Sequence, residues 1–116
     1  MNIKKFREVI AQRINVEEIS HGEWIDGIEE CWKKEIEILA EDIPSTIDFL
    51  KNECTADEYS WISEILDKLV EITHSKELVS CYKELMKKFP EESVEYNIAA
   101  CIEDAEAILK WEENQK

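Results

Sequence analysis

Residues 55–73 read TADEYSWISEILDKLVEIT, and this stretch decides the fold class. Thr55 stands three residues before Glu58, which is the spacing of a capping box at a helix start. Apolar side chains then recur at intervals of three and four residues, as on one broad face of a helix. That face comprises Tyr59, Ile62, Ile65, Leu66, Leu69 and Ile72. The stretch therefore predicts an amphipathic helix that ends near Thr73.

The residues before this stretch predict three more helices. Apolar periodicity indicates one over roughly 2–14 and another over about 23–41, with a break near residues 15–22 between them. Pro44 fits the first turn of a third helix, for which Asp42 is a suitable N-cap. The first half of the chain is therefore expected to be helical.

The residues after the stretch predict two further helices. Ser75 is a suitable N-cap for the first, and Pro90 should stop it. The second begins near Val94 and should fray over residues 110–116. With these, the sequence predicts an all-α single domain, residues 1–116, of about six amphipathic helices in antiparallel hairpins.

A spacing of 37 residues leaves two architectures open. The pairs Trp24-Ile25, Trp61-Ile62 and Ile98-Ala99 recur at that interval, which lies within the range of two-helix solenoid repeats. Any amphipathic helix rich in isoleucine gives similar pairs by chance. The helices are therefore expected to form either a short solenoid or an irregular bundle.

Charge is distributed unevenly along the chain. The 116 residues carry a net charge of −14, and 28 acidic residues oppose 14 lysines and arginines. Residues 1–16 form a basic first helix, whereas residues 17–58 hold fourteen acids against three lysines. Such a field repels the phosphates of nucleic acids and anionic membranes, and it speeds encounter with a basic protein. We therefore expect a basic protein partner, with no nucleic acid and no membrane among the partners.

The second predicted helix carries the densest acidic stripe. Its acids lie opposite the apolar face, and they are Glu23, Asp26, Glu30, Glu37 and Glu41. Two like-charge pairs at i, i+4 within it each cost about 0.2–0.5 kcal/mol in an isolated helix. Helix stability alone does not favour such pairs. Trp24 lies off the apolar face beside these acids, which is typical of an apolar anchor in an interface, although a tryptophan at the edge of the core fits the pattern too.

Catalytic and metal-binding motifs are weak. Glu18 to His21 and Glu71 to His74 both have the Glu-x-x-His spacing of di-iron helical bundles. Both histidines fall at expected helix ends instead of mid-helix, so a di-iron enzyme is the less favoured alternative. We expect no catalytic residues, no cofactor and no metal.

Four cysteines, Cys31, Cys54, Cys81 and Cys101, are widely spaced and form no Cys-x-x-Cys pair. Free cysteines of this kind behave as small core hydrophobes in a reducing compartment. The N-terminal residues lack the apolar stretch of a signal peptide. The protein is expected to be cytoplasmic.

Five segments carry a family resemblance: residues 38–43 (ILAEDI), 46–50 (TIDFL), 58–65 (EYSWISEI), 73–75 (THS) and 88–91 (KFPE). They resemble small helical immunity proteins of bacterial polymorphic-toxin and contact-dependent growth inhibition systems. The resemblance covers roughly residues 36–108 and rests mostly on packing and capping residues. It implies a protein that binds the C-terminal domain of its cognate toxin and covers its active site or substrate path. Such toxins are often nucleases with basic clefts, which an acidic inhibitor complements.

The expected toxin-binding surface extends the acidic stripe with acids of the following segments. Its residues are Glu23, Trp24, Asp26, Glu30, Glu37, Glu41, Asp42, Asp48, Asp57 and Glu58. A helical adaptor that binds host proteins is the alternative from the same all-α fold.

Overall fold

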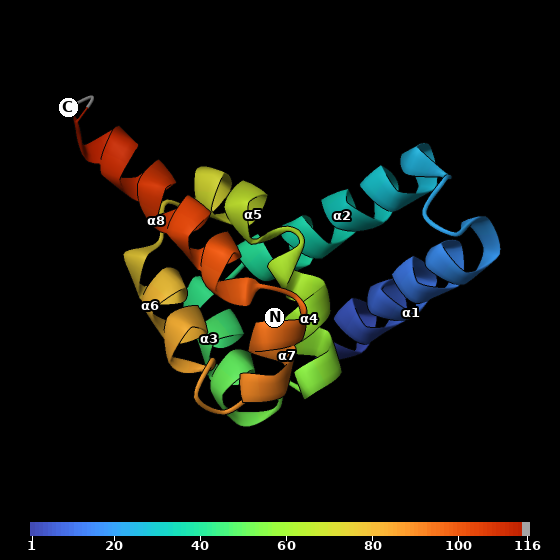
Figure 1. The fold of residues 1–116 in the computed structure, drawn as a ribbon, viewed down its shortest axis with the longest axis horizontal. Coiled ribbons are helices and arrows are strands. Elements are labelled where there is room, and N and C mark those ends of the chain that lie inside the picture. Colours follow the sequence, from blue (N-terminus) through green and yellow to red (C-terminus); the bar gives the residue numbers. More distant parts are fainter. Residues whose placement is uncertain (115–116) are drawn as a thin grey trace.

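Eight helices make up the computed structural model, which describes residues 1–114 (Figure 1). They are α1 (Ile3–Ser20), α2 (Ile25–Ala40), α3 (Ile43–Asn52), α4 (Ala56–Ser63), α5 (Leu66–Thr73), α6 (Lys76–Glu84), α7 (Pro90–Glu95) and α8 (Ile98–Asn114). No strand occurs in this range. The all-α class is confirmed, whereas the expected number of about six helices is too low. None of these helices is long and apolar enough to cross a membrane.

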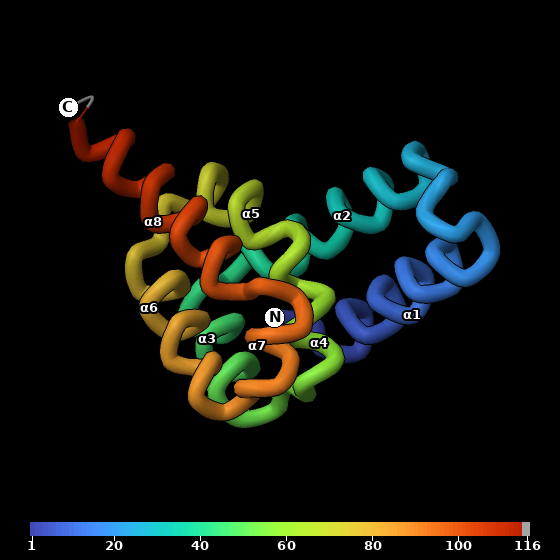
Figure 2. Tube along the Cα trace, viewed as in Figure 1, coloured from blue at the N-terminus to red at the C-terminus, as the bar shows by residue number. Residues whose placement is uncertain are grey.

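The first two helices form a hairpin that stands apart from the rest. Figures 1 and 2 show α1 and α2 running antiparallel, with their connecting end projecting away from the body formed by α3 to α8. The opposite end of the hairpin joins the main core, where Phe6 of α1 packs edge-on against Phe49 of α3 with ring centroids 5.6 Å apart. A second, small apolar cluster of Val16, Ile28 and Cys31 lies within the hairpin. The hairpin therefore has packing of its own beyond the main core.

The predicted helix starts are confirmed where a side chain caps the backbone. Thr55 accepts a hydrogen bond from the Glu58 amide (3.1 Å), and the Glu58 carboxylate accepts one from the Thr55 amide (3.0 Å). Asp42 caps α3, and Ser75 caps α6. These caps are local in sequence, and each satisfies backbone donors that a helix start leaves unpaired.

The predicted break at residues 15–22 is shorter in the structure. Helix α1 continues to Ser20, because Arg13 pairs with Glu17 one turn later (2.8 Å) and Val16 packs into the hairpin cluster. The chain turns only at His21 (φ 53°) and Gly22 (φ 80°). The hairpin is therefore longer at this end than the sequence predicts.

The helix predicted over 55–73 is two helices, and the break falls at Glu64 and Ile65. The hydroxyls of Ser60 and Ser63 donate to carbonyl oxygens three residues earlier, which competes with regular helix bonding. The break also rotates the apolar face of α5. Val70 is buried there, whereas Ile72 is 60% exposed, so its predicted place in the core is wrong.

Pro90 begins a helix instead of ending one. Helix α6 already ends at Glu84, and Pro90 occupies the first turn of α7, where its missing N–H costs nothing. Asn97 (φ 49°) then separates α7 from α8, so the final predicted helix is also divided. Fraying was predicted over 110–116, but α8 continues through Asn114; Gln115 and Lys116 lie outside the described residues.

The 37-residue spacing does not correspond to a structural repeat. Trp24 is the exposed N-cap residue of α2, Trp61 lies within α4, and Ile98 opens α8. Helix α8 packs on α5, α6 and α7, whereas solenoid units contact only their neighbours. The arrangement of α3 to α8 is therefore an irregular bundle.

Candidate protein-binding surface

The acidic stripe of α2 faces solvent. Asp26, Glu30 and Glu37 are all exposed. Lys34 pairs with Glu30 at 3.7 Å, whereas Asp26 and Glu37 have no ion pair among the residues that the structure describes. The stripe was predicted from helical periodicity, and α2 does bring these carboxylates to solvent along one helix.

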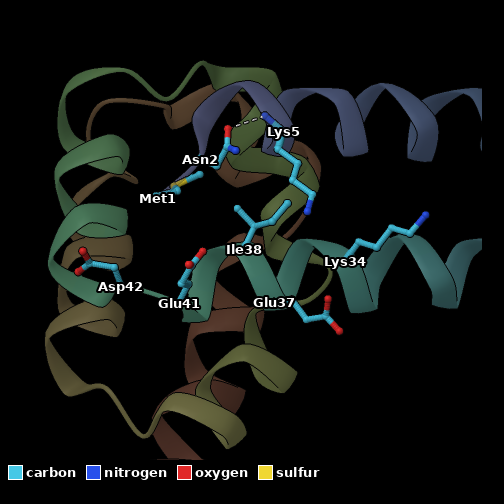
Figure 3. Close-up of a pocket in the computed structure, with 8 residues that line it drawn as sticks. All are labelled: Met1, Asn2, Lys5, Lys34, Glu37, Ile38, Glu41 and Asp42. Atoms are coloured by element: carbon cyan, nitrogen blue, oxygen red, sulfur yellow. Dashed lines mark hydrogen bonds between the residues drawn. The ribbon is translucent and has the colours of Figure 1, made fainter.

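A hollow of ≈ 840 Å³ lies where the end of α2 meets the starts of α1 and α3. Figure 3 shows Lys5 of α1 reaching toward α2 and Glu41 pointing toward Asn2, whereas Glu37 and Asp42 point outward. Charges of both signs line this open space. Its carboxylates extend the acidic stripe to the end of α2, but the mixed lining fixes no single ligand.

Trp24 is 56% exposed, as expected for an apolar anchor beside the stripe. Its indole ring lies against the first turn of α2 at Gly27, where a methyl group would come within 2.6 Å of the ring atom Cδ2. A glycine is thus what allows the ring to lie there. Glu23, the residue before it, is exposed as well.

Three predicted binding residues lie on the body of the molecule. Asp48 is exposed on α3 and accepts a hydrogen bond from Asn52 (2.9 Å), and Asp57 is exposed in the first turn of α4. Glu58 is 7% exposed and holds the α4 capping box while it pairs with Arg7 at 2.9 Å. Its prediction as part of an open binding face is wrong, because both carboxylate oxygens are already engaged within the fold.

A buried polar cluster between the hairpin and the body was missed by the sequence analysis. Arg13 is 5% exposed, and it donates from Nε to Glu64 Oε1 (2.8 Å) and from Nη2 to Glu64 Oε2 (3.1 Å). The Trp32 indole donates to the same Oε1 (2.7 Å), and the Arg13 guanidinium lies 4.9 Å from the Trp61 ring centroid. One arginine therefore joins α1 to the turn between α4 and α5. The burial of Arg13 could have been predicted from helical periodicity. Arg13 lies on the same face of α1 as the apolar residues Phe6, Val9, Ile10 and Val16.

Glu35 of α2 is fully buried, and neither carboxylate oxygen has a hydrogen-bond partner. Burial and, secondarily, the charge of Glu64 raise the pKa of Glu35 from 4.5 to about 8, although Arg13 acts in the opposite direction. Glu35 is therefore largely protonated at neutral pH. Glu35 lies four residues after Cys31 and four before Leu39, so helical periodicity places it on the apolar stripe of α2. That position predicts burial, but the sequence analysis counted Glu35 only as one of the acidic residues.

The two Glu-x-x-His motifs end at separate helix termini. His21 and His74 are the C-cap residues of α1 and α5, both exposed and both in the left-handed conformation (φ 53°). His74 contacts Glu112 of α8. Over residues 1–114 no three histidine, cysteine or acidic side chains are grouped closely enough to hold a metal ion. The predicted helix-end positions of both histidines are confirmed.

Three of the four cysteines are buried, and Cys101 is partly buried; all four are unpaired. Burial raises the pKa of the Cys54 thiol to about 12. A thiol so hard to ionise packs as a small apolar group, as the sequence predicts.

Comparison of the chain with family models, with curated proteins and with solved structures finds no match.

Proposed function

We propose that this protein is an immunity protein, a non-catalytic inhibitor that binds the C-terminal domain of a cognate toxin in the cytoplasm. The toxin domain that fits best is a basic nuclease, whose active site or substrate path the inhibitor covers. The observation that carries the proposal is the exposed, largely unpaired acidic stripe of α2 with the exposed Trp24 at its start.

Charge is the first support. From Glu23 to Asp42 the chain has seven exposed acidic residues, besides the buried Glu35, and only Lys33 and Lys34 to oppose them. Concentrated surface charge of one sign accelerates association with a surface of the opposite sign and repels partners of like charge. The same stripe disfavours binding to phosphate backbones and to anionic lipids.

The second support is that the acids of the stripe form few ion pairs within the fold. Acids elsewhere do pair within the fold: Glu58, Glu64 and Glu17 each bind an arginine of α1, and Glu106, Glu112 and Glu113 of α8 pair with Lys83, His74 and Lys76. Asp26 and Glu37 take no part in these contacts. Acids that add repulsion without stabilising contacts are consistent with selection for binding.

The test uses the C-terminal domain of the toxin encoded beside this protein's gene, purified as a catalytically inactive variant. Binding is measured by biolayer interferometry at two salt concentrations, and inhibition is measured on the active nuclease. We expect stoichiometric inhibition and an association rate that falls steeply with salt. A wild-type chain that neither binds nor inhibits this domain contradicts the proposal.

A charge-reversal pair tests the stripe itself. The double variant Asp26→Lys/Glu30→Lys should associate on the order of tenfold more slowly and with a weaker salt dependence. The matched control is Glu91→Lys/Glu95→Lys, an exposed i, i+4 pair on α7 that changes net charge equally. If both double variants slow association alike, only net charge matters and the α2 stripe is not the interface.

A further inference from the structure

The connecting end of the α1–α2 hairpin exposes a group of large apolar side chains. We call residues 17–26 the hairpin tip. Within it Ile19 is 69% exposed, Trp24 56% and Ile25 62%, so three of the large exposed hydrophobic residues fall in ten consecutive positions. Those elsewhere, Ile72, Val94, Tyr96 and Trp111, are spread over α5, α7, α8 and the turn between the last two.

The tip is held in one shape by local contacts. The His21 amide donates to the Glu17 carbonyl (2.8 Å), and the Glu23 amide donates to the Ser20 carbonyl (3.0 Å). Beneath the tip, the small cluster of Val16, Ile28 and Cys31 joins the two helices. A preorganised apolar surface loses little conformational freedom when it binds.

Acidic residues are neighbours in sequence of the apolar residues of the tip. Residues 17–26 include four acids and no lysine or arginine. Arg13, which lies outside the tip, neutralises Glu17. Glu18, Glu23 and Asp26 remain exposed beside Ile19, Trp24 and Ile25, without ion pairs in the part of the chain that the structure describes.

Shape distinguishes the tip from the rest of the acidic surface. Figures 1 and 2 show the hairpin projecting beyond the body, so its end is convex and free on several sides. A projecting end that carries exposed apolar side chains and neighbouring carboxylates complements a concave surface with both apolar and basic groups. A second copy of this chain or an anionic membrane meets like charge at this point.

We propose that the hairpin tip inserts into a basic cleft of the toxin domain, with Trp24 as the apolar anchor and Ile19 and Ile25 beside it. This inference rests on the proposed function and specifies its mode, which is occlusion of the substrate path by a protruding hairpin. The stripe along α2 steers the encounter, and the tip slows dissociation.

The experiment compares truncations of exposed apolar side chains. Trp24→Ala and the triple variant Ile19→Ser/Trp24→Ala/Ile25→Ser are tested against the same inactive toxin domain, with Trp111→Ala as the control. Trp111 is 64% exposed near the end of α8, so its truncation removes a similar exposed area away from the tip. Circular dichroism and thermal melting verify that each variant is folded.

For Trp24→Ala we expect a dissociation rate at least tenfold faster with a nearly unchanged association rate, and a larger loss for the triple variant. Trp111→Ala should bind as the wild type does. A photo-crosslinker placed at position 25 should label cleft residues of the toxin domain, and a substrate-like oligonucleotide should suppress that labelling.

Different results contradict the proposed function and the insertion of the tip. If the wild-type chain does not bind the toxin domain, both the proposed function and this inference are wrong. Wild-type binding that survives the triple variant, or crosslinks that lie outside the cleft, overturns insertion of the tip while the proposed function stands.

Discussion

Arg13 donates two parallel hydrogen bonds to Glu64, from Nε to Oε1 (2.8 Å) and from Nη2 to Oε2 (3.1 Å), although the two residues lie 51 positions apart in the sequence. This fork joins the hairpin to the body, because Arg13 belongs to α1 and Glu64 to the turn after α4. Bidentate pairs of this kind are among the stronger polar contacts in proteins.

Removing one partner of this pair should be costly. Arg13→Met leaves the Glu64 carboxylate without its cation and close to the buried Glu35. Because the Glu64 side chain is 25% exposed and keeps part of its hydration, we expect the free energy of unfolding to fall by roughly 1.5–3 kcal/mol. Urea denaturation followed by circular dichroism measures it. Lys83→Met is the control, since its pair with Glu106 is exposed on both sides and should cost about 1 kcal/mol or less. Equal losses in the two variants would show that the buried fork has no special role.

Glu35 should make stability fall as pH rises. Its pKa is about 8 in the folded protein and 4.5 in its ordinary state, so between these values the folded state binds more protons than the unfolded one. The contribution of Glu35 therefore becomes progressively unfavourable from about pH 4.5 to about pH 8, and it amounts to on the order of 3 kcal/mol at pH 7.

Glu35→Gln removes the titrating carboxyl group. The variant should therefore become increasingly more stable than the wild type as the pH rises from about 4.5 to about 8. The measurement is a series of urea denaturations from acidic to mildly alkaline pH. Glu37→Gln, an exposed position two residues later, should leave the pH dependence close to that of the wild type. A constant difference between Glu35→Gln and the wild type at every pH would contradict the buried, protonated state.

Tyr59 and Tyr82 each donate their hydroxyl to the other's backbone carbonyl, and their rings stack 4.4 Å apart. Both side chains are fully buried. Tyr82→Phe should keep the stacking and lose one buried hydrogen bond, which lowers the free energy of unfolding by about 1–2 kcal/mol. Tyr96→Phe, at an exposed position, should leave the free energy of unfolding unchanged. If Tyr82→Phe also leaves it unchanged, the hydrogen bonds between the two tyrosines add no stability.

Substitution by alanine should have different effects at the two glycines, on tryptophan exposure at Gly27 and on stability at Gly22. At Gly27 a methyl group displaces the Trp24 ring, so we expect increased acrylamide quenching of tryptophan fluorescence with little loss of stability, because alanine favours the helix. At Gly22 the positive φ of 80° disfavours any side chain, so stability should fall by about 1 kcal/mol. Unchanged quenching in Gly27→Ala would show that the ring does not depend on the glycine.

Sequence reasoning succeeded where the determinants are local. The caps at Thr55, Asp42 and Ser75 involve residues three positions apart, and all three are present. For Trp24 the sequence left an exposed anchor and a residue at the edge of the core both open, and the structure shows it exposed.

It failed where a distant partner decides the outcome. Glu58 was grouped with surface acids although its capping box already engages one carboxylate oxygen; the other accepts from Arg7, 51 residues earlier, which nothing near Glu58 in sequence reveals. Ile72 was assigned to the core by extending one periodicity across a break at Glu64, whose side chain is held by Arg13. Glu35 was missed for a different reason, since its place on the apolar stripe of α2 is local information but an acid count treats a protonated core residue as surface charge.

The separation of the hairpin tip from the main core has an evolutionary consequence. Ile19, Trp24 and Ile25 contribute nothing to the packing of Phe6, Leu39 and Tyr59, and substitutions at distant sites without shared partners add independently. These three positions, unlike Gly22 with its positive φ, can therefore vary in sequence with little penalty in folding. Over evolution their side chains can be exchanged while the helices that carry them remain the same.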